Sequence, residues 1–308
     1  MGKQAVQARV AAAVAVCALA SGCVSLVPFE RVRAEVGDAG FVQVGGQRVH
    51  VEQAGEGEPV VLLHGFGGST YLWRQMTPRL AGHFRVVAID LNGFGWTERP
   101  RAREAYTLEG QAALVLGVLD ALGIERAHLV GHSYGGGLAI WLAAQHPERV
   151  RSLSLVASTL PTYASARRSR WAAWRPLVAL FVRTRALREG FVRRGLERAV
   201  ADPTIVTDEL VRAYLARLRV EGATRAFQGL TAPTSEVRPE VRLEALHVPT
   251  LGVWGEQDRL LSVEAGARGV GRIPGSRFVR LPGVGHLPME EAPDRLAAAL
   301  EEFLAAQP

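Results

Sequence analysis

The chain has 308 residues, of which 48% are hydrophobic and 21% are charged, and its formal net charge is +6. This composition excludes an intrinsically disordered chain, because the apolar fraction is sufficient for a large core and the net charge is small for the length. The 33 glycines and 16 prolines follow no three-residue period, which excludes a fibrous protein. Both cysteines, Cys17 and Cys23, lie near the N-terminus, so the rest of the chain has no disulfide, cysteine nucleophile or cysteine-ligated metal.

The first 22 residues have the pattern of a secretory signal peptide. A basic start precedes an apolar run over residues 10–20, which is too short to cross a bilayer as a helix. The sequence Ala-Ser-Gly-Cys, ending at Cys23, resembles the cleavage box of bacterial lipoproteins, although Ala20 stands where that box more often has leucine. We therefore expect a chain that begins at a lipid-modified Cys23, is anchored in the cell envelope outside the cytoplasm, and has residues 23–36 as a tether. The alternatives are an ordinary signal peptide, giving a secreted or periplasmic protein, and an uncleaved anchor.

From residue 37 onward, short apolar strands alternate with helical patterns. Alternating apolar segments around a glycine-containing turn predict an antiparallel hairpin at 40–46 and 48–54. Continuous apolar runs predict strands that are buried on both faces, and helical spacing predicts the helices between them. The elements predicted next are a strand at 59–64, a helix at 69–80 capped by Ser69 or Thr70, a strand at 84–89, a helix at 107–122, a strand at 127–130, a helix at 135–145 and a strand at 150–156.

The alternation stops at about residue 161 and resumes with strands at 250–254 and 276–281 and a helix at 293–306. The segment 161–233 is helical in pattern and has fourteen arginines against six acidic residues, a balance of +8. Such a basic segment can bind nucleic acid or an anionic membrane, but a solvated helical face is the commoner cause. We interpret 161–236 as a helical cap inserted into one α/β core, formed by residues 37–160 and 237–308, whose sheet is mostly parallel.

Ser133 is the candidate nucleophile. It lies in Gly131-His-Ser-Tyr-Gly135, between a predicted strand and a predicted helix. Glycines two residues on either side leave room for a tight turn that lifts the hydroxyl above the sheet. The following helix also directs its first N–H groups, with their partial positive charge, at whatever the serine attacks.

A serine hydroxyl needs a base, and His286 is the best candidate among the eight histidines. It follows the last strand on a glycine-flanked loop, from which an imidazole can reach the edge of the sheet. His64 and His132 lie inside turns, and the other five histidines have no comparable setting. Asp258, just after the strand at 250–254, is the candidate acid that orients the base, with Glu256 as its rival.

Attack of a serine on an acyl carbon also needs hydrogen-bond donors that stabilise the oxyanion formed from the carbonyl oxygen. The glycine-rich loop His64-Gly-Phe-Gly-Gly-Ser69 follows a strand and allows the N–H of Phe66 to point into the same cavity as the N–H of Tyr134. A phosphate-binding loop is disfavoured, because no Gly-Lys-Ser/Thr or G-x-G-x-x-G pattern is present. The loop 90–95 either shapes the floor of the pocket or is a simple turn at the end of a strand.

These motifs, in this order and spacing, resemble the α/β-hydrolase fold family over residues 37–308. The resemblance implies that Ser133 is the nucleophile, His286 the base and Asp258 the acid, with oxyanion donors at Phe66 and Tyr134 and a cap over the site. Relatives that use an aspartate nucleophile, the haloalkane dehalogenases and epoxide hydrolases, are disfavoured by Ser133, whereas meta-cleavage-product hydrolases use serine and remain possible. The expected architecture is a mostly parallel sheet flanked by helices, with an inserted helical lid.

The leading hypothesis is a serine esterase that acts on small esters, with no metal or organic cofactor. An aromatic and aliphatic cluster near the start of the cap either lines an apolar acyl pocket, contacts lipid or packs the cap on the core; it comprises Trp171, Trp174, Leu177, Val178, Leu180, Phe181 and Val182. The alternatives with the same three residues are cleavage of a C–C, lactone or amide bond, or perhydrolysis. A non-catalytic envelope binding protein is a weaker reading, and nucleic acid is not an expected partner.

Overall fold

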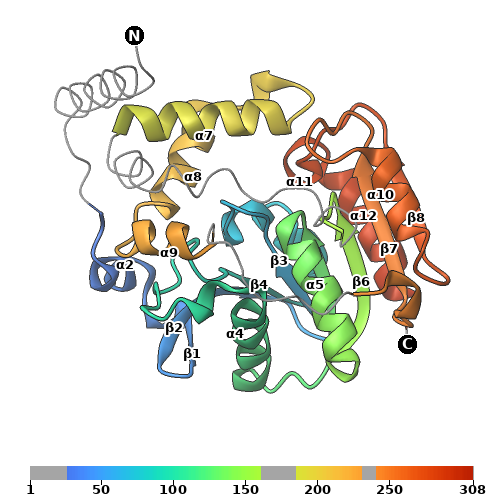
Figure 1. Ribbon diagram of the computed structural model, residues 1–308, viewed down its shortest axis with the longest axis horizontal. Helices are drawn as coiled ribbons and strands as arrows, with labels where there is room; N and C mark the ends of the chain where they lie inside the picture. The colour runs from blue at the N-terminus through green and yellow to red at the C-terminus, as the bar shows by residue number, and fades with distance from the viewer. Residues whose placement is uncertain (1–25, 161–184, 231–240, 308) are drawn as a thin grey trace, which may run out of the picture.

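A computed structural model describes residues 26–160, 185–230 and 241–307. An eight-stranded sheet with the order β1-β2-β4-β3-β5-β6-β7-β8 lies at its centre (Figure 1). The hairpin β1–β2 and the pair β2–β4 are antiparallel, and every other pair is parallel, which confirms the predicted mostly parallel sheet. The strands are β1 (Phe41–Val44), β2 (Gln47–Ala54), β3 (Pro59–Leu63), β4 (Arg85–Ile89), β5 (Ala127–His132), β6 (Val150–Val156), β7 (Thr250–Gly255) and β8 (Arg277–Leu281).

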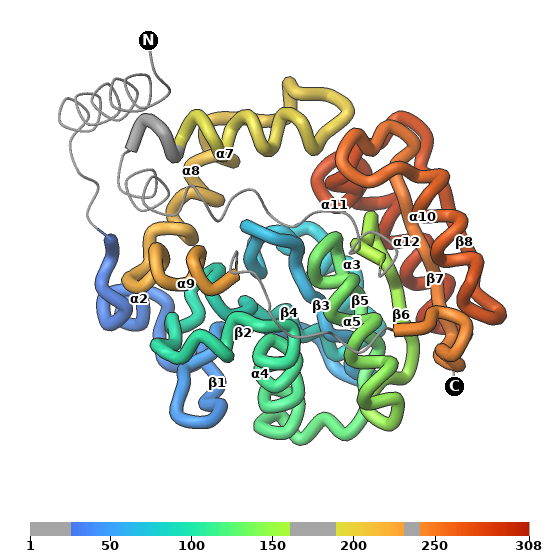
Figure 2. The backbone as a smooth tube through the Cα atoms, in the orientation of Figure 1, coloured from blue at the N-terminus to red at the C-terminus, as the bar shows by residue number. Residues whose placement is uncertain are grey.

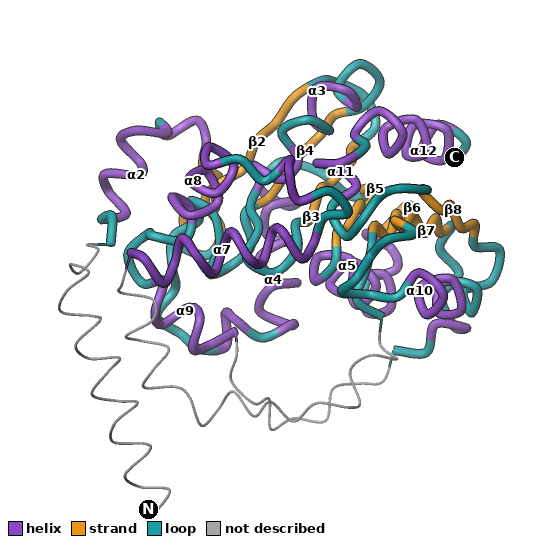
Figure 3. Tube along the Cα trace, turned by 90° about the horizontal axis from the view of Figure 1, so that it is seen from above, coloured by secondary structure: helices purple, strands orange, loops and turns teal. Residues whose placement is uncertain are grey.

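Helices cover both faces of the sheet (Figure 3). Successive side chains of β3 point to opposite faces, so Val61 and Leu63 join one apolar cluster while Val60 and Leu62 join the other. The first cluster includes α4 (Leu108–Ala121), α5 (Tyr134–Gln145) and α10 (Val263–Val270), and the second includes α3 (Thr77–Leu80) and α12 (Pro293–Ala305). Shorter elements are η1 (Asp38–Gly40), η2 (Thr70–Trp73), η3 (Glu104–Tyr106), η4 (Pro147–Arg149), η8 (Leu243–Ala245) and α11 (Pro288–Glu291).

The prediction of one continuous helix over residues 69–80 is wrong. The structure has the 3-10 turn η2 followed by the one-turn helix α3, and the side chain of Ser69 makes no capping hydrogen bond. Pro78 has no N–H to donate within a longer helix, and its ring would clash with the preceding turn. Thr70 is also held by the core, because its N–H donates to Asp90 Oδ1 (2.6 Å) and its hydroxyl donates to Glu52 Oε1 (2.7 Å).

Between β6 and β7 the described chain is helical, as predicted for the cap. It contains α7 (Arg185–Ala199), η7 (Pro203–Ile205), α8 (Asp208–Arg217) and α9 (Ala223–Leu230). Figure 2 shows α7 and α8 above the sheet, at the end where its parallel strands finish. The predicted apolar cluster at 171–182 lies outside the described residues.

The structure differs from the predicted tether over residues 29–36, which form the helix α2 (Phe29–Val36). Phe29 and Val32 are buried against Val220, which lies between α8 and α9, and these three residues form an apolar cluster of their own. The sequence did not indicate this contact, because the cluster joins two segments about 190 residues apart. Within the three described ranges, no helix is long and apolar enough to cross a membrane.

His128 on β5 is buried in the sheet and gives a pH-dependent contribution to stability. Its Nδ1 lies 2.7 Å from Ser152 Oγ, and burial, aided by Arg151 and Arg126, lowers its pKa from 6.5 to about 4. The unfolded chain therefore takes up this proton first, and stability falls as the pH falls from about 6.5 towards 4.

We expect this histidine to account for a loss of about 2 kcal/mol between pH 7.5 and pH 5. Urea unfolding measures this contribution when the unchanged protein and His128→Gln are compared at both pH values. Glutamine does not titrate, so the variant should lack the part of the loss that comes from His128. An identical pH dependence of the two proteins would contradict the prediction.

Candidate active site

Ser133 occupies a strained turn between β5 and α5. Its backbone angles, φ +50° and ψ −113°, lie in a region that costs a residue with a side chain about 1–3 kcal/mol. The turn is tight: a Cβ on Gly135 would lie 2.3 Å from the carbonyl oxygen of Leu63, and one on Gly131 would lie 2.5 Å from that of Gly135. Only glycine therefore fits at these two positions, and the serine stands at the end of the strand as the motif predicts.

His286 lies on the loop after β8 and is oriented by Asp258, on the loop after β7. The Nδ1 atom of His286 is 2.7 Å from Asp258 Oδ2. Because a carboxylate only accepts, Nδ1 carries the proton and Nε2 keeps a free lone pair. The other carboxylate oxygen of Asp258 accepts hydrogen bonds from the N–H groups of Leu260 (2.8 Å) and Leu261 (2.9 Å), which fix its direction. Glu256, the rival acid, is exposed.

Ser133 and His286 line one cavity of about 410 Å³ under the cap. Phe66 also lines it, and Tyr134 is the residue directly after Ser133, at the start of α5. Apolar side chains and glycines make up almost all of the described lining, and none of it is lysine, arginine, aspartate or glutamate: Gly65, Gly67, Gly68, Leu72, Gly93, Phe94, His132, Phe191, Val192, Gly195, Leu196, Ala199, Tyr214, Leu218, Ala223, Phe227, Leu230, Leu260 and Leu287. The cavity thus suits an uncharged, apolar ligand.

His64 holds the backbone of the loop that carries Phe66. Its Nδ1–H donates to the carbonyl of Gly65 (2.7 Å), and its Nε2 accepts the N–H of Leu91 (3.1 Å). Complete burial lowers the pKa of His64, which keeps the ring neutral as this pair of bonds requires. The Gly65 carbonyl and the Phe66 N–H belong to one trans peptide and point in opposite directions, so this hydrogen bond also sets the direction of the Phe66 N–H.

His132, the residue before Ser133, is hydrogen-bonded to the loop that carries His286. Its Nε2–H donates to the backbone carbonyl of His286 (2.9 Å), and the two rings lie 4.8 Å apart. Burial holds the pKa of His132 well below its usual value, and the neighbouring His286 lowers it further. A neutral His132 therefore adds no positive charge beside the base.

Glu291 holds the loop of His286 through backbone hydrogen bonds, a role that the sequence did not indicate. Its carboxylate accepts the N–H groups on both sides of the base, from Gly285 (2.9 Å) and Leu287 (3.2 Å), and that of Ala201 from the cap (2.7 Å). Burial raises the pKa of Glu291 against the lowering effect of these N–H groups, and the nearby Asp258 also raises it. The only sequence signal was an acidic residue five positions after His286, in a helical stretch where a solvated carboxylate is the default reading.

We expect Glu291→Gln to lower the kcat of a reaction that uses His286 as its base by about 10-fold or more, with KM within about twofold, because a small displacement of the base slows the chemical step. The amide nitrogen of glutamine would face an N–H group where an oxygen now accepts it. Steady-state kinetics measure the effect, and Glu302→Gln, an exposed residue that pairs with Arg277, is the matched control. Equal kcat values for both variants would show that Glu291 does not position the base.

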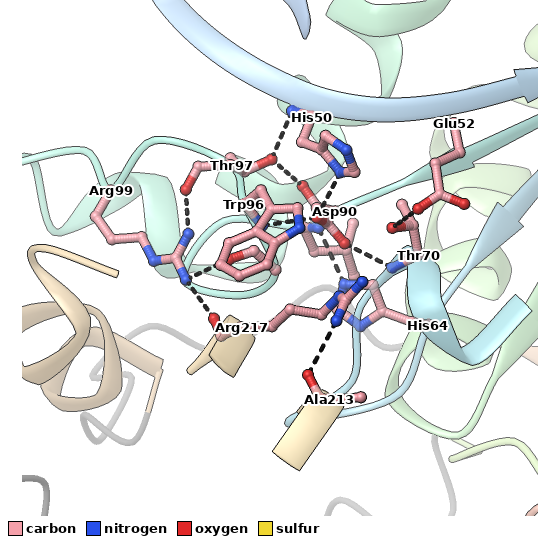
Figure 4. A network of polar contacts seen from close by, with 12 residues as sticks. His50, Glu52, His64, Thr70, Asp90, Trp96, Thr97, Arg99, Ala213 and Arg217 are labelled. Carbon is pink, nitrogen blue, oxygen red and sulfur yellow. Dashed lines mark hydrogen bonds and ion pairs between the residues drawn. The ribbon is translucent and has the colours of Figure 1, made fainter. Parts of the chain in front are cut away.

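The loop 90–95 is organised by the fully buried carboxylate of Asp90 (Figure 4). The same loop contributes to the floor of the cavity. Asp90 accepts hydrogen bonds from the N–H groups of Thr70 (2.6 Å) and Trp96 (2.7 Å) and from His50 Nδ1 (2.7 Å). Burial alone would raise the pKa of Asp90, but His50, His64 and the Trp96 N–H together lower it well below its usual range. Both sequence interpretations of this loop therefore apply, since it is a strand-end turn that also lines the pocket through Gly93 and Phe94.

Arg99 extends this network to the cap. It is fully buried, its guanidinium donates to the carbonyls of Gly95 (2.8 Å), Thr97 and Arg217 (3.1 Å), and burial lowers its pKa to about 10. Because Arg217 is the last residue of α8, this side chain connects the floor of the cavity to a helix that lines its wall.

Cys23, the predicted lipidation site, lies outside the described residues. In the ranges that are described, no three histidine, cysteine, aspartate or glutamate side chains are placed to hold a metal ion.

Comparison with known proteins gives consistent matches. A family profile described as alpha/beta hydrolase fold matches residues 58–293. A 2-hydroxymuconate semialdehyde hydrolase from Pseudomonas putida is 33% identical over 275 residues, covering 84% of this chain and 92% of the relative. Two solved structures are similar to this chain: a meta-cleavage product hydrolase from Pseudomonas fluorescens (28% identity, TM-score 0.72) and a thermophilic esterase from Thermogutta terrifontis (25% identity, TM-score 0.72). Each match covers 86% of this chain and 97% of the solved chain.

Proposed function

The chain belongs to the alpha/beta hydrolase fold family, and on that premise we propose that it is a serine hydrolase that cleaves carboxylic esters with an uncharged, apolar acyl group. One observation carries the proposal: Ser133 and His286 line the same apolar cavity, and His286 is held through Nδ1 by Asp258. This is the arrangement that an alcohol nucleophile, a general base and an orienting carboxylate require.

In this mechanism Ser133 Oγ attacks the acyl carbon while His286 Nε2 takes the hydroxyl proton. The N–H groups of Phe66 and Tyr134 donate to the oxyanion, an interaction worth roughly 3–4 kcal/mol for a single donor. His286 then gives the proton to the departing alcohol, leaving an acyl-enzyme. A water molecule, deprotonated by the same nitrogen, releases the acid and restores Ser133. Asp258 keeps the ring in the required tautomer and stabilises the imidazolium. No step uses a metal or an organic cofactor.

Cleavage of a C–C bond is the second candidate, because several relatives are named for it. Their printed names, such as 2-hydroxymuconate semialdehyde hydrolase and 2-hydroxy-6-oxo-2,4-heptadienoate hydrolase, contain the anions of carboxylic acids. Burying a carboxylate without a partner costs several kcal/mol, and the described lining of the cavity offers no arginine or lysine. This lining favours the ester over the charged dienoate.

A substrate panel tests the choice. We expect p-nitrophenyl butyrate or octanoate to be hydrolysed with a kcat/KM at least about 10-fold above that of a p-nitrophenyl ester of equal length ending in a carboxylate, which corresponds to about 1.4 kcal/mol of transition-state binding. A dienoate with a higher kcat/KM than any ester would establish the C–C hydrolase instead. Lactones and amides complete the panel, since the same residues serve those bonds.

For location, we propose that the chain is anchored in the cell envelope, outside the cytoplasm, through lipid on Cys23. The supporting observation is the N-terminal sequence, a basic start and a short apolar run that ends in Ala-Ser-Gly-Cys. An anchor with two or more acyl chains gives stable attachment to a bilayer. In this location a nucleic-acid partner is not expected.

A further inference from the structure

The N-terminal end of the described chain is hydrogen-bonded to the cap. The N–H of Val27 donates to the carbonyl of Arg219 (2.8 Å), and the N–H of Glu221 donates to the carbonyl of Val27 (2.8 Å), forming a parallel bridge between Val27 and Val220. The side chain of Glu221 also accepts the N–H of Phe29 (3.4 Å). With the buried cluster around Val220, these bonds make α2 and the 219–221 segment one local unit.

This contact lies beside the proposed substrate cavity. Val220 separates α8 from α9, and both helices line that cavity, α8 through Tyr214 and α9 through Phe227. Figures 1 and 3 show α2 on the same flank of the molecule as α8 and α9. The chain therefore enters the folded body at the base of the cap, rather than at the opposite end of the sheet.

Val27 lies only four positions after Cys23, and four residues of extended chain span at most about 14 Å. If Cys23 carries the lipid, Val27 lies within about that distance of the bilayer surface, and the base of the cap is held there with it. From this geometry we infer that the anchored protein lies with its cap side on the lipid bilayer and takes apolar esters directly from it. The inference rests on the proposed ester hydrolase function and on the proposed anchor.

The chemistry of this side fits a bilayer as the partner. Phe66 and Leu260, on the core side of the cavity, are 50% and 46% exposed although both are large and apolar. An apolar cavity with large exposed apolar residues at its lining matches the acyl chains of a lipid bilayer.

The orientation is tested on the full lipidated protein in vesicles of phosphatidylethanolamine and phosphatidylglycerol. Because no cysteine follows Cys23, a fluorophore can be placed at Arg212→Cys, an exposed position on α8, or at Glu125→Cys, an exposed position just before β5 at the opposite end of the sheet. We expect nitroxide-labelled headgroups to quench the probe at 212 at least about threefold more than the probe at 125. Equal quenching, or stronger quenching at 125, would overturn the inference, as would a mature N-terminus that carries no lipid by mass spectrometry.

A second measurement links the orientation to catalysis. A 20-residue Gly-Ser linker inserted between residues 24 and 25 adds an r.m.s. reach of about 25 Å, so it releases the cap from the bilayer without altering the cavity. We expect hydrolysis of a long-chain ester dissolved in the vesicles to fall at least about fivefold, with a water-soluble butyrate ester unaffected. The same linker inserted between residues 306 and 307 is the control and should change neither rate.

Equal rates on the bilayer ester with and without the N-terminal linker would overturn substrate capture from lipid. Failure of the unchanged protein on both esters would refute the ester hydrolase function, while the quenching experiment would still decide the orientation.

Discussion

Replacing Ser133 with alanine is expected to lower kcat for p-nitrophenyl butyrate by at least about 10⁴-fold, while the protein remains folded. The variant keeps the cavity, the proposed oxyanion donors and the His286–Asp258 pair, but it has no atom that can form the acyl-enzyme. Loss of the nucleophile in comparable sites leaves only the residual catalysis that comes from binding and oxyanion stabilisation. The effect belongs in kcat, because alanine removes only the attacking oxygen and leaves the apolar lining of the cavity in place, so KM should change little.

Ser276→Ala is the matched control for this experiment. Ser276 Oγ donates to the carbonyl of Val270 (2.8 Å), in the turn between α10 and β8, and the residue does not line the cavity. Its kcat should stay within about twofold of the unchanged protein, with a small cost in stability. An active Ser133→Ala protein would refute the proposed mechanism, whatever the control shows.

The Asp90→Asn variant is expected to lose about 3–5 kcal/mol of unfolding free energy, the largest effect on stability that we foresee. Asp90 is fully buried and its two side-chain oxygens accept three hydrogen bonds, from the N–H groups of Thr70 and Trp96 and from His50 Nδ1. An asparagine has one acceptor oxygen, so its NH₂ group would face a donor in a site that water cannot reach. The change therefore removes a hydrogen bond, adds a donor–donor contact and discards the charge that interacts with His50.

Urea unfolding at pH 7.5 measures this loss, and Asp120→Asn is its control. Asp120 is an exposed carboxylate 2.6 Å from Arg149 Nη2, and pairs of this kind contribute less than about 1 kcal/mol. A loss below about 1 kcal/mol for Asp90→Asn would mean that the buried network does not stabilise the fold as described. We also expect that variant to have lower esterase activity, since the same loop places Phe94 in the floor of the cavity.

The elements of the core were predictable because their signals are local. Buried parallel strands are continuous apolar runs, as in residues 59–63, and helix α4 begins directly after Thr107, whose hydroxyl accepts the N–H of Gly110 as a cap should. The errors have two sources: a proline inside a predicted helix, and contacts between segments distant in the sequence. Pro78 and the Asp90–Thr70 bond divide the helix predicted at 69–80, and Val220 gives α2 a partner that residues 23–36 cannot reveal on their own.

The candidate site also contains residues that a local sequence signal pointed to and residues that had no such signal. Glycine spacing identified Ser133, and position after a strand identified His286 and Asp258, because parallel strands bring their carboxyl ends to one edge. In the structure Ser133 and His286 line one cavity, and Asp258 lies within hydrogen-bond distance of His286; their catalytic roles stay a prediction. The residues that hold them had no such signal: Glu291 acts on backbone N–H groups, and Asp90 contacts segments from 50 to 96, so only the folded chain shows what either carboxylate touches.

Labelling with a fluorophosphonate tests the central claim most directly, because this reagent reacts much faster with a serine whose proton a neighbouring base removes than with an ordinary serine. The account predicts one adduct per chain, mapped by mass spectrometry to the peptide that contains Ser133, and a loss of labelling in His286→Ala. An unlabelled folded protein, or an adduct on another residue, would contradict it.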